Sequence, residues 1–297
     1  AMSAHKSVRA FDGSAVRQFP GPEAERTTEP PNHRTTEQGD VASLVARAAL
    51  ARALALVFAP PRGPVLNFLK DSLASKVAEA ATYLDKGPAL QAGAEAAAQA
   101  LGDGGGLEGE YHRLFGTGLA VTPYETEYGP VREARKGPVL ADISGFYEAF
   151  GFRPAPGAAE LPDHIGMELE FFGLLLVKEA DARARAAAEE AAVAADAART
   201  FFADHLAPWV PAFGQGLREA ARHPFYVAVA QLLHVFLEGE ASRLGCSLGE
   251  AEEQAPAVME EGLACPMAPG DPSALSCLPP PAPLPGGGEA KVRGSPE

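Results

Sequence analysis

The start of a helix is the clearest signal in this chain, and it lies in residues 161–172, Leu161-Pro-Asp-His-Ile-Gly-Met-Glu-Leu-Glu-Phe-Phe172. Asp163 follows a proline and precedes a periodic apolar run, which is typical of an N-cap residue. The run repeats apolar side chains at spacings of three and four: Ile165, Leu169, Phe172 and Leu176. This spacing predicts one buried face. His164 and Glu168 lie one turn apart on the adjacent stripe, where we expect the edge between core and solvent.

Helical periodicity also extends over most of the remaining chain. We expect helices over residues 40–59, 65–84, 89–101, 140–150, 163–180, 183–206, 211–222 and 225–244, and a short helix or turn over 111–115. Asp40 is the expected N-cap of the first helix, and residues 121–138 are expected to form a loop. Because no alternating strand pattern occurs, the sequence predicts an all-α fold with about nine or ten helices in a single domain.

The two ends of the chain differ in composition from the part between them. Residues 1–39 are polar and aperiodic, and residues 265–297 are rich in proline and glycine. Both compositions predict disorder, as an N-terminal arm and a C-terminal tail. The helical domain is therefore expected to span residues 40–264.

Net charge and hydropathy restrict the class of partner. The 297-residue chain has a formal net charge of −14. Such an acidic surface repels phosphate backbones and argues against nucleic acid as the main partner. No apolar run approaches the ~20 residues that span a bilayer, so stable membrane insertion is not expected. The N-terminus lacks the layout of a secretion signal. We therefore expect a cytoplasmic protein.

The sequence contains no recognisable catalytic or cofactor-binding motif. A P-loop, a GxGxxG after a strand and a G-x-S-x-G elbow are all missing. Cys246, Cys265 and Cys277 are odd in number and form no CxxC pair, which makes a disulfide framework or a metal cluster improbable. No catalytic residue, metal or cofactor is predicted.

The pair His164 and Glu168 is open to three interpretations. Together with Asp163 nearby and with Asp204-His205 as a second contributor, the pair could hold a metal ion, which would suit a metal-dependent hydrolase. It could instead form a recognition edge, in which carboxylates accept a cationic side chain and Phe171 supplies apolar contact. The third interpretation is a helix N-terminus whose polar groups bond the neighbouring backbone.

The segment Pro123-Tyr-Glu-Thr-Glu-Tyr128 alternates aromatic and acidic residues. Tyr124 and Tyr128 flank Glu125 and Glu127, which suits the binding of arginine through charge-assisted hydrogen bonds and stacking. Alternatively, the tyrosines pin the loop to the body of the protein. Both interpretations can hold together.

Five short motifs follow one another in a fixed order over residues 40–245. They are Tyr111-x-x-Leu114-Phe115, Pro123-Tyr124-Glu125-x-x-Tyr128, Phe146-Tyr147-x-x-Phe150-Gly151-Phe152, Pro162-Asp163-His164-x-x-x-Glu168-Leu169-x-Phe171 and His205-Leu206-x-x-Trp209. In this order they resemble the TorD/DmsD/NarJ-type family of redox-enzyme maturation chaperones. The loop 123–128 departs from the family pattern in its second charged residue, which leaves the subgroup open.

The resemblance implies an all-α chaperone without a cofactor of its own. Such proteins bind the twin-arginine leader or the apoprotein of a molybdopterin-containing oxidoreductase and delay its export until the cofactor is inserted. The leader has an arginine pair followed by an apolar stretch, so its receptor needs carboxylates beside an apolar groove. The residues expected to form this peptide-binding site are Tyr124, Glu125, Glu127, Tyr128, Tyr147, Asp163, His164, Glu168 and Phe171. Those expected to have structural roles are Tyr111, Phe115, Pro162, His205 and Trp209.

Two other functions remain open at this point. One is the hydrolase that would use His164 and Glu168, and the other is a permanently bound helical subunit of a redox complex. The sequence does not decide between a monomer and a dimer.

Overall fold

The computed structural model describes residues 33–116, 120–129, 132–153 and 160–251. Within these ranges the chain forms ten α-helices, one short 3-10 helix, one π-helix and no strand, which confirms the all-α prediction. Of the segments predicted to be disordered, residues 1–32 and 265–297 lie outside the described ranges. The prediction is wrong for residues 33–39, which form the start of a helix. None of the helices in these ranges combines the length and the apolar character that a bilayer crossing requires.

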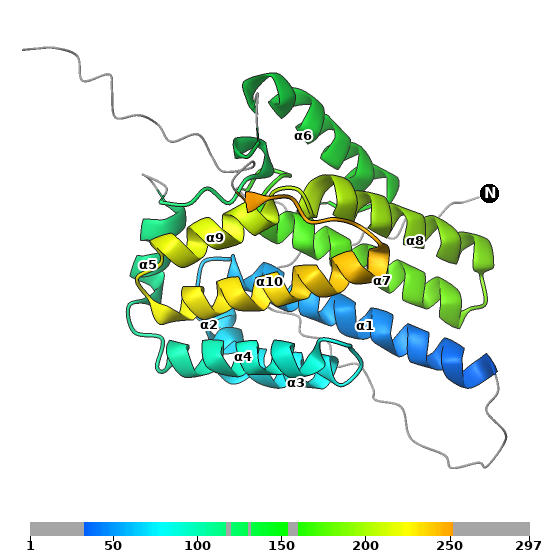
Figure 1. Cartoon of the computed structure of the whole chain (residues 1–297), viewed down its shortest axis with the longest axis horizontal. Helices are drawn as coiled ribbons and strands as arrows, with labels where there is room; N and C mark the ends of the chain where they lie inside the picture. Colours follow the sequence, from blue (N-terminus) through cyan, green and yellow to red (C-terminus); the bar gives the residue numbers. More distant parts are fainter. Residues whose placement is uncertain (1–32, 117–119, 130–131, 154–159, 252–297) are drawn as a thin grey trace, which may run out of the picture. The chain divides into compact units, whose positions relative to one another are not determined.

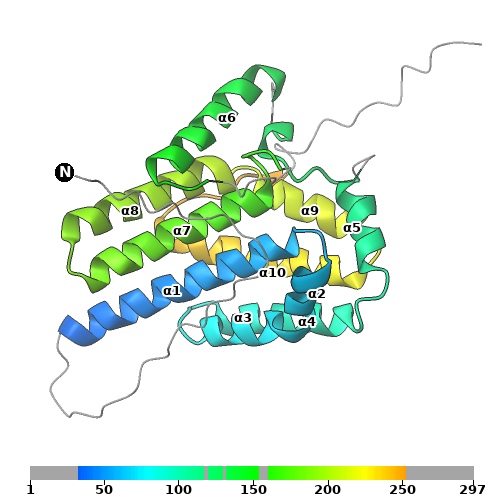
Figure 2. The ribbon, with the colours of Figure 1, turned by 180° about the vertical axis from the view of Figure 1, so that it is seen from behind.

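The helices follow one another with short connections. In chain order they are α1 (His33–Val57), α2 (Gly63–Asp71), α3 (Leu73–Ala81), α4 (Gly87–Leu101), α5 (Leu107–Phe115), the 3-10 helix η1 (Glu125–Glu127), α6 (Arg132–Ala149), α7 (Ile165–Ala184), α8 (Ala188–Phe201), the π-helix η2 (Phe202–Leu206), α9 (Val210–Ala220) and α10 (Pro224–Leu244). Figures 1 and 2 show α1 between α7 on one side and the pair α3–α4 on the other. Helix α10 packs on α4 and α9, and α8 packs on α7.

Helix α7 is buried on more than one face. Its predicted stripe of Ile165, Leu169, Phe172 and Leu176 is fully buried, and so are Phe171 and Leu175 on the adjacent stripe. The reason is that α1 covers one side of α7 and α8 covers another. Gly173 allows the close approach of α1, since a Cβ atom there would lie 3.2 Å from the carbonyl oxygen of Ala48.

Several helix boundaries differ from the sequence prediction. The short helix expected over residues 111–115 begins at Leu107, and the helix expected over 183–206 is α8 followed by the π-helix η2.

Three further differences have a clear cause. Helix α1 begins at His33, seven residues before Asp40, because a formed helix is extended at little free-energy cost even by polar residues. The helix expected over residues 65–84 is two helices that meet at Ser72, whose φ of −130° leaves the helical region. Serine favours such helix ends over helix interiors.

The third difference is that α6 begins inside the predicted loop of residues 121–138. Pro138 lies within α6, although the sequence predicts that it belongs to the loop before the helix. A proline removes one backbone hydrogen bond and crowds the carbonyl four residues earlier. Residues 134–138 are exposed, so water can hydrate the carbonyl that loses its partner.

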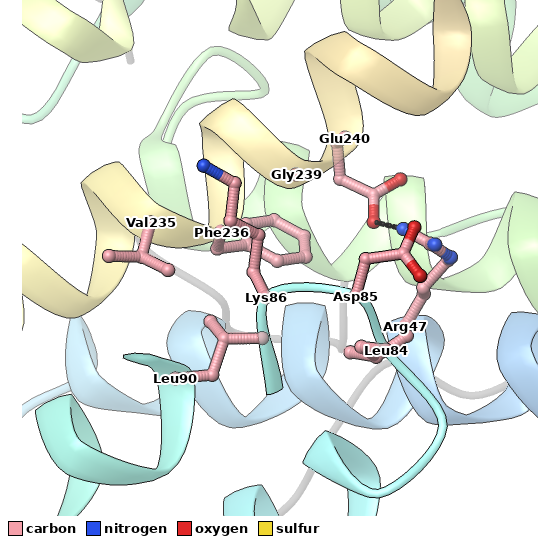
Figure 3. A pocket seen from close by; sticks show the side chains of 9 residues that line it. All are labelled: Arg47, Leu84, Asp85, Lys86, Leu90, Val235, Phe236, Gly239 and Glu240. Carbon is pink, nitrogen blue, oxygen red and sulfur yellow. Dashed lines mark hydrogen bonds and ion pairs between the residues drawn. The ribbon is translucent and has the colours of Figure 1, made fainter. Parts of the chain in front are cut away.

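A buried ion pair joins the first and last helices of the described body. Nη1 of Arg47 on α1 donates to Oε1 of Glu240 on α10 at 2.7 Å. Figure 3 shows this pair at the edge of a cavity of about 20 Å³, which Asp85 and Lys86 also line. A space of this size holds about one water molecule.

Candidate functional site

The two segments with the strongest motifs meet in space. Tyr124 and His164 form an isolated antiparallel bridge, in which the amide of Glu125 donates to the carbonyl of Asp163 at 3.0 Å. On the other side of the bridge, the amide of Ile165 donates to the carbonyl of Pro123 at 2.9 Å. The backbone thereby fixes η1 against the first turn of α7.

The cap of α7 differs from the prediction. His164, and not Asp163, is the N-cap: its Nδ1 accepts from the amide of Gly166 at 3.0 Å. Burial lowers the pKa of His164, which favours the neutral imidazole that this cap requires. The carboxylate of Asp163 instead accepts from Thr126, at 2.7 Å from the hydroxyl and 3.2 Å from the amide. Asp163 therefore anchors η1 rather than α7.

His205 lies between two carboxylates. It comes from the π-helix η2, and its Nδ1 lies 3.0 Å from Glu125 Oε2 while its Nε2 lies 3.1 Å from Asp142 Oδ2. Burial lowers the pKa of His205, but the hydrogen bonds and charges of Glu125 and Asp142 outweigh this effect and raise it above the usual value. His205 thereby links η1 to α6, and its protonated form can donate to both carboxylates.

Glu168 is fully buried, so the expectation that it lies at the edge of the core is wrong, as it is for His164. The Glu168 carboxyl accepts from Trp209 Nε1 at 3.2 Å. Burial and the nearby Glu125 carboxylate raise the pKa of Glu168 well above its usual value, which favours the protonated acid. The sequence could not reveal this burial because the covering residues come from η1 and from the start of α9, far away along the chain.

Aromatic rings enclose this polar network. The Tyr147 and Phe171 rings are 4.7 Å apart, and the Tyr147 hydroxyl donates to the Pro162 carbonyl at 2.8 Å. The Tyr128 ring lies 5.0 Å from Trp209, and its hydroxyl donates to the carbonyl of Thr122. These contacts pin the loop to the body, as one of the two interpretations of the loop expects.

Only part of the predicted peptide-binding set reaches solvent. Seven of its nine residues are buried: Glu125, Tyr128, Tyr147, Asp163, His164, Glu168 and Phe171. Tyr124 is half-buried, and its hydroxyl donates to Glu160 at 2.7 Å. The side chain of Glu127 is 35% exposed and accepts from Lys136 of α6 at 2.9 Å. The structure thus gathers all nine residues around one junction and leaves Tyr124 and Glu127 at its rim.

The remaining residues expected to be structural lie in two places. His205, Trp209 and Pro162 belong to the junction described above. Tyr111 and Phe115 lie in a separate aromatic cluster with Phe58, Phe213 and Tyr226. The hydroxyl of Tyr111 donates to the carbonyl of Phe58 at 3.4 Å.

The geometry does not favour a metal site. In the described part of the chain, no group of three or more His, Cys, Asp or Glu side chains is placed to hold a metal ion. Nδ1 of His164 is engaged by its own helix, and Glu168 is engaged by Trp209. The interpretation of His164 and Glu168 as metal ligands therefore has no support.

Sequence reasoning missed several members of the site, including Thr126, Lys136 and Glu160, which bond predicted residues. Two more, Asp142 and Phe201, lie around His205 and Phe171. Asp142 completes the pair of carboxylates around His205, and Phe201 packs 4.7 Å from Phe171. Asp142 has no distinguishing signal in the sequence, since an acidic residue on an exposed helix face is common. Phe201 lies only four residues before His205, so the His205-Leu206-x-x-Trp209 motif could have drawn attention to it.

Comparisons with known proteins identify relatives of this chain. Residues 70–215 match the family model described as "Nitrate reductase delta subunit". The chain is 35% identical over 142 residues to a chlorate reductase assembly chaperone of Ideonella dechloratans. The aligned region covers 47% of this chain and 70% of that relative. The chain is 32% identical over 160 residues to a selenate reductase assembly chaperone of Thauera selenatis, with 52% and 75% coverage. A TorD chaperone of Photobacterium profundum is 33% identical over 112 residues, with 37% and 48% coverage.

With these relatives, five motifs in order and an all-α fold, the chain belongs to the TorD-type family of redox-enzyme maturation chaperones. The members of this family are assembly chaperones and not enzymes, and the same holds for this protein.

Proposed function

We propose that this protein is a cytoplasmic chaperone dedicated to one molybdopterin-containing oxidoreductase. It binds the twin-arginine leader of the apoenzyme, the apoenzyme itself, or both. By holding the leader it delays export until the molybdenum cofactor is inserted. The relatives that assemble chlorate and selenate reductases support a client of the same kind, a reductase of a small oxyanion.

The observation that carries this proposal is the rim formed by Tyr124 and Glu127. Glu127 already accepts a cationic side chain, Lys136, at 2.9 Å. An arginine would bind this carboxylate more strongly than lysine does, because a guanidinium can donate two parallel hydrogen bonds. Tyr124 lies three residues before Glu127 and adds an aromatic surface on which a guanidinium can stack.

The buried members of the predicted site have a supporting role in this proposal. Asp163 binds Thr126, the residue before Glu127, and His205 binds Glu125, the residue after Tyr124. These buried hydrogen bonds hold the backbone next to both rim residues in place. A rim that is held in one conformation loses less conformational entropy when a peptide binds. Burial of the leader's apolar stretch, at about 25 cal/mol per Å², supplies most of the affinity, and the arginine contacts set its register.

Isothermal titration of the purified protein with synthetic leaders of molybdoenzymes encoded beside its gene tests this function. We expect micromolar or tighter binding that is lost when the arginine pair or the apolar stretch of the leader is replaced. Glu127→Gln removes the rim charge and should weaken binding about three- to tenfold. Glu148→Gln, an equal change of charge at an exposed position of α6, should leave it unchanged. Absence of binding to every leader, with binding to a mature apoenzyme, would restrict the function to the second target.

A further inference from the structure

Helix α6 has the same layout of charge and apolar residues as a twin-arginine leader. Its first half carries the adjacent cations Arg135 and Lys136. A stripe of apolar side chains follows at helical spacing: Val139, Leu140, Ile143, Phe146 and Tyr147. Phe150 comes directly after the end of the helix. A leader combines the same two features in the same order.

The basic end of α6 lies on the rim. Lys136 donates to Glu127 at 2.9 Å, which is the contact that the proposed function assigns to a leader arginine. The lysine and glutamate side chains are 46% and 35% exposed, so water competes with this pair. Such pairs are weak and exchange readily.

The apolar stripe of α6 covers the aromatic floor of the site. The ring of Phe146 lies 5.4 Å from Phe201 and 6.4 Å from Phe171. Tyr147 packs 4.7 Å from Phe171. Without α6, Phe171, Phe201 and His205 would form an apolar surface with one charged group at its edge, next to Glu127.

The attachment of α6 to the body is narrow. Among the α6 side chains that the structure describes, only Ile143 and Tyr147 are buried. Two further hydrogen bonds hold the helix: His205 to Asp142 at 3.1 Å, and the Tyr147 hydroxyl to the Pro162 carbonyl. Figures 1 and 2 both show α6 at the margin of the body, beside α8 and with no helix on its outer side.

We propose that α6 is an internal occupant of the leader-binding surface, and that the leader binds by displacing it. The surface comprises Glu127, Phe171, Phe201 and His205, and its partner is a segment with a basic pair followed by an apolar helix. This inference rests on the proposed function, since it assigns the leader's site. It also accounts for the burial of Phe171 and Phe201, since Phe146 and Tyr147 of α6 pack on their rings. The apparent affinity for a leader then falls with the fraction of molecules in which α6 is displaced.

The test weakens the contact of α6 with the body without altering the surface beneath it. Asp142→Asn removes the carboxylate that His205 holds, while His205 keeps its hydrogen bond to Glu125. The probe is a synthetic peptide with an arginine pair followed by a leucine- and alanine-rich stretch of a leader. We expect Asp142→Asn to bind it about two- to fivefold more tightly than the wild type, because a partly exposed ion pair contributes this much. Glu148→Gln, on the outer face of α6, is the matched control and should bind like the wild type.

Hydrogen exchange provides the second readout. When the probe binds, amide exchange within residues 134–149 should become faster, while the first turn of α7 becomes better protected. Binding that leaves α6 exchange unchanged or slower, with equal affinities for Asp142→Asn and Glu148→Gln, would overturn this inference and leave the proposed function standing. Failure of the wild type and of both variants to bind any leader would overturn both. If Asp142→Asn does not fold, Lys136→Gln makes the same test at the basic end of α6. Loss of the ion pair between Lys136 and Glu127 should also raise the affinity for the probe.

Discussion

At the scale of single residues, the polar network of the site contains two groups with raised pKa values, the carboxyl group of Glu168 and the imidazole of His205. Glu168 is fully buried beside Glu125, and burial together with that neighbour raises its pKa. His205 is flanked by Glu125 and Asp142, which raise its pKa despite burial. Burial also raises the pKa of Glu125, although its hydrogen bond with His205 opposes this shift.

Glu168→Gln should therefore change stability little. The amide has the shape of a protonated carboxyl, and its oxygen can still accept from Trp209 Nε1. We expect a loss below about 1 kcal/mol, against about 2–4 kcal/mol for Glu168→Ala, because the alanine leaves a cavity in the core. The indole N–H keeps its hydrogen bond to the His205 carbonyl in both variants. Urea unfolding followed by fluorescence of Trp209, the single tryptophan, measures both values.

The pH dependence of Glu168→Gln gives an independent check. The folded wild type binds the Glu168 proton more tightly than the unfolded chain does. Wild-type stability should therefore decrease as the pH rises above the ordinary glutamate value of 4.5, and the variant should lack this contribution. Equal destabilisation by Gln and Ala at pH 7 would indicate that Glu168 carries a charge in the folded state.

The residues of the site could be named from the sequence, but their exposure could not. The motifs around Tyr124 and His164 bring together the side chains that meet in the structure. A periodic pattern shows which stripe of a helix is most apolar, and it places Glu168 off that stripe. It contains no information on α8, η1 or α9, which cover the adjacent stripe of α7 and bury Glu168 as well.

At the scale of elements, Glu110 fastens α5 to the turn between α9 and α10. Its Oε1 accepts from the amides of Arg222 and His223, the latter at 3.1 Å. Both of its oxygens also accept from Arg113, at 2.7 and 2.8 Å. The hydrogen bonds from Arg113 and from the two amides hold the pKa of Glu110 at about 2, well below its usual value of 4.5, although burial opposes the shift.

The contribution of these Glu110 contacts to the stability of the protein should be lost in acid. Because the folded-state pKa of Glu110 is depressed, its contribution is present above pH 4.5 and is lost as the pH falls towards about 2. Glu110→Gln should lower the free energy of unfolding at pH 7 by up to about 3 kcal/mol, and the difference from the wild type should shrink below pH 4.5. Urea unfolding at a series of pH values measures the difference.

Glu108→Gln is the matched control for this element. Glu108 pairs with Arg62 at 2.8 Å, but both side chains are more than half exposed. Its replacement should lower stability by less than about 1 kcal/mol at any pH. A Glu110 variant that behaves like this control would contradict the assigned role of the buried carboxylate.

Helix existence was predictable from the sequence, whereas several boundaries were not. The helix predicted over residues 89–101 matches α4 within two residues because Gly102, with a φ of +54°, ends it. Pro138 gave the opposite result: its exposure allows α6 to continue, and exposure depends on the tertiary fold. His164 replaced Asp163 as the cap of α7 since Thr126, distant in sequence, binds the carboxylate.

At the scale of the whole molecule, the ion pair between Arg47 and Glu240 connects two segments 193 residues apart. The side chains are only 10% and 2% exposed, and Arg243 provides a second cation for Glu240 at 3.0 Å. Figure 3 shows that the pair lies where α1 and α10 pass the turn before α4. Such a contact ties the first helix of the described body to the last and should make its unfolding cooperative.

Glu240→Ala should therefore destabilise the whole body rather than one end of it. The substitution leaves Arg47 buried without its carboxylate, which costs about 3–5 kcal/mol in comparable pairs. The double variant Arg47→Met, Glu240→Leu removes both charges and fills the space, so it should be more stable than Glu240→Ala alone. Urea unfolding followed both by helical circular dichroism and by Trp209 fluorescence should give one coincident transition for each protein. Glu238, on the same helix as Glu240, provides the control. Glu238→Ala breaks a half-exposed ion pair with Lys86 and should lower the free energy of unfolding by less than about 1 kcal/mol. If Glu240→Ala costs no more than Glu238→Ala, or if the double variant is the least stable of the three, α1 and α10 are held together by apolar packing and not by this ion pair.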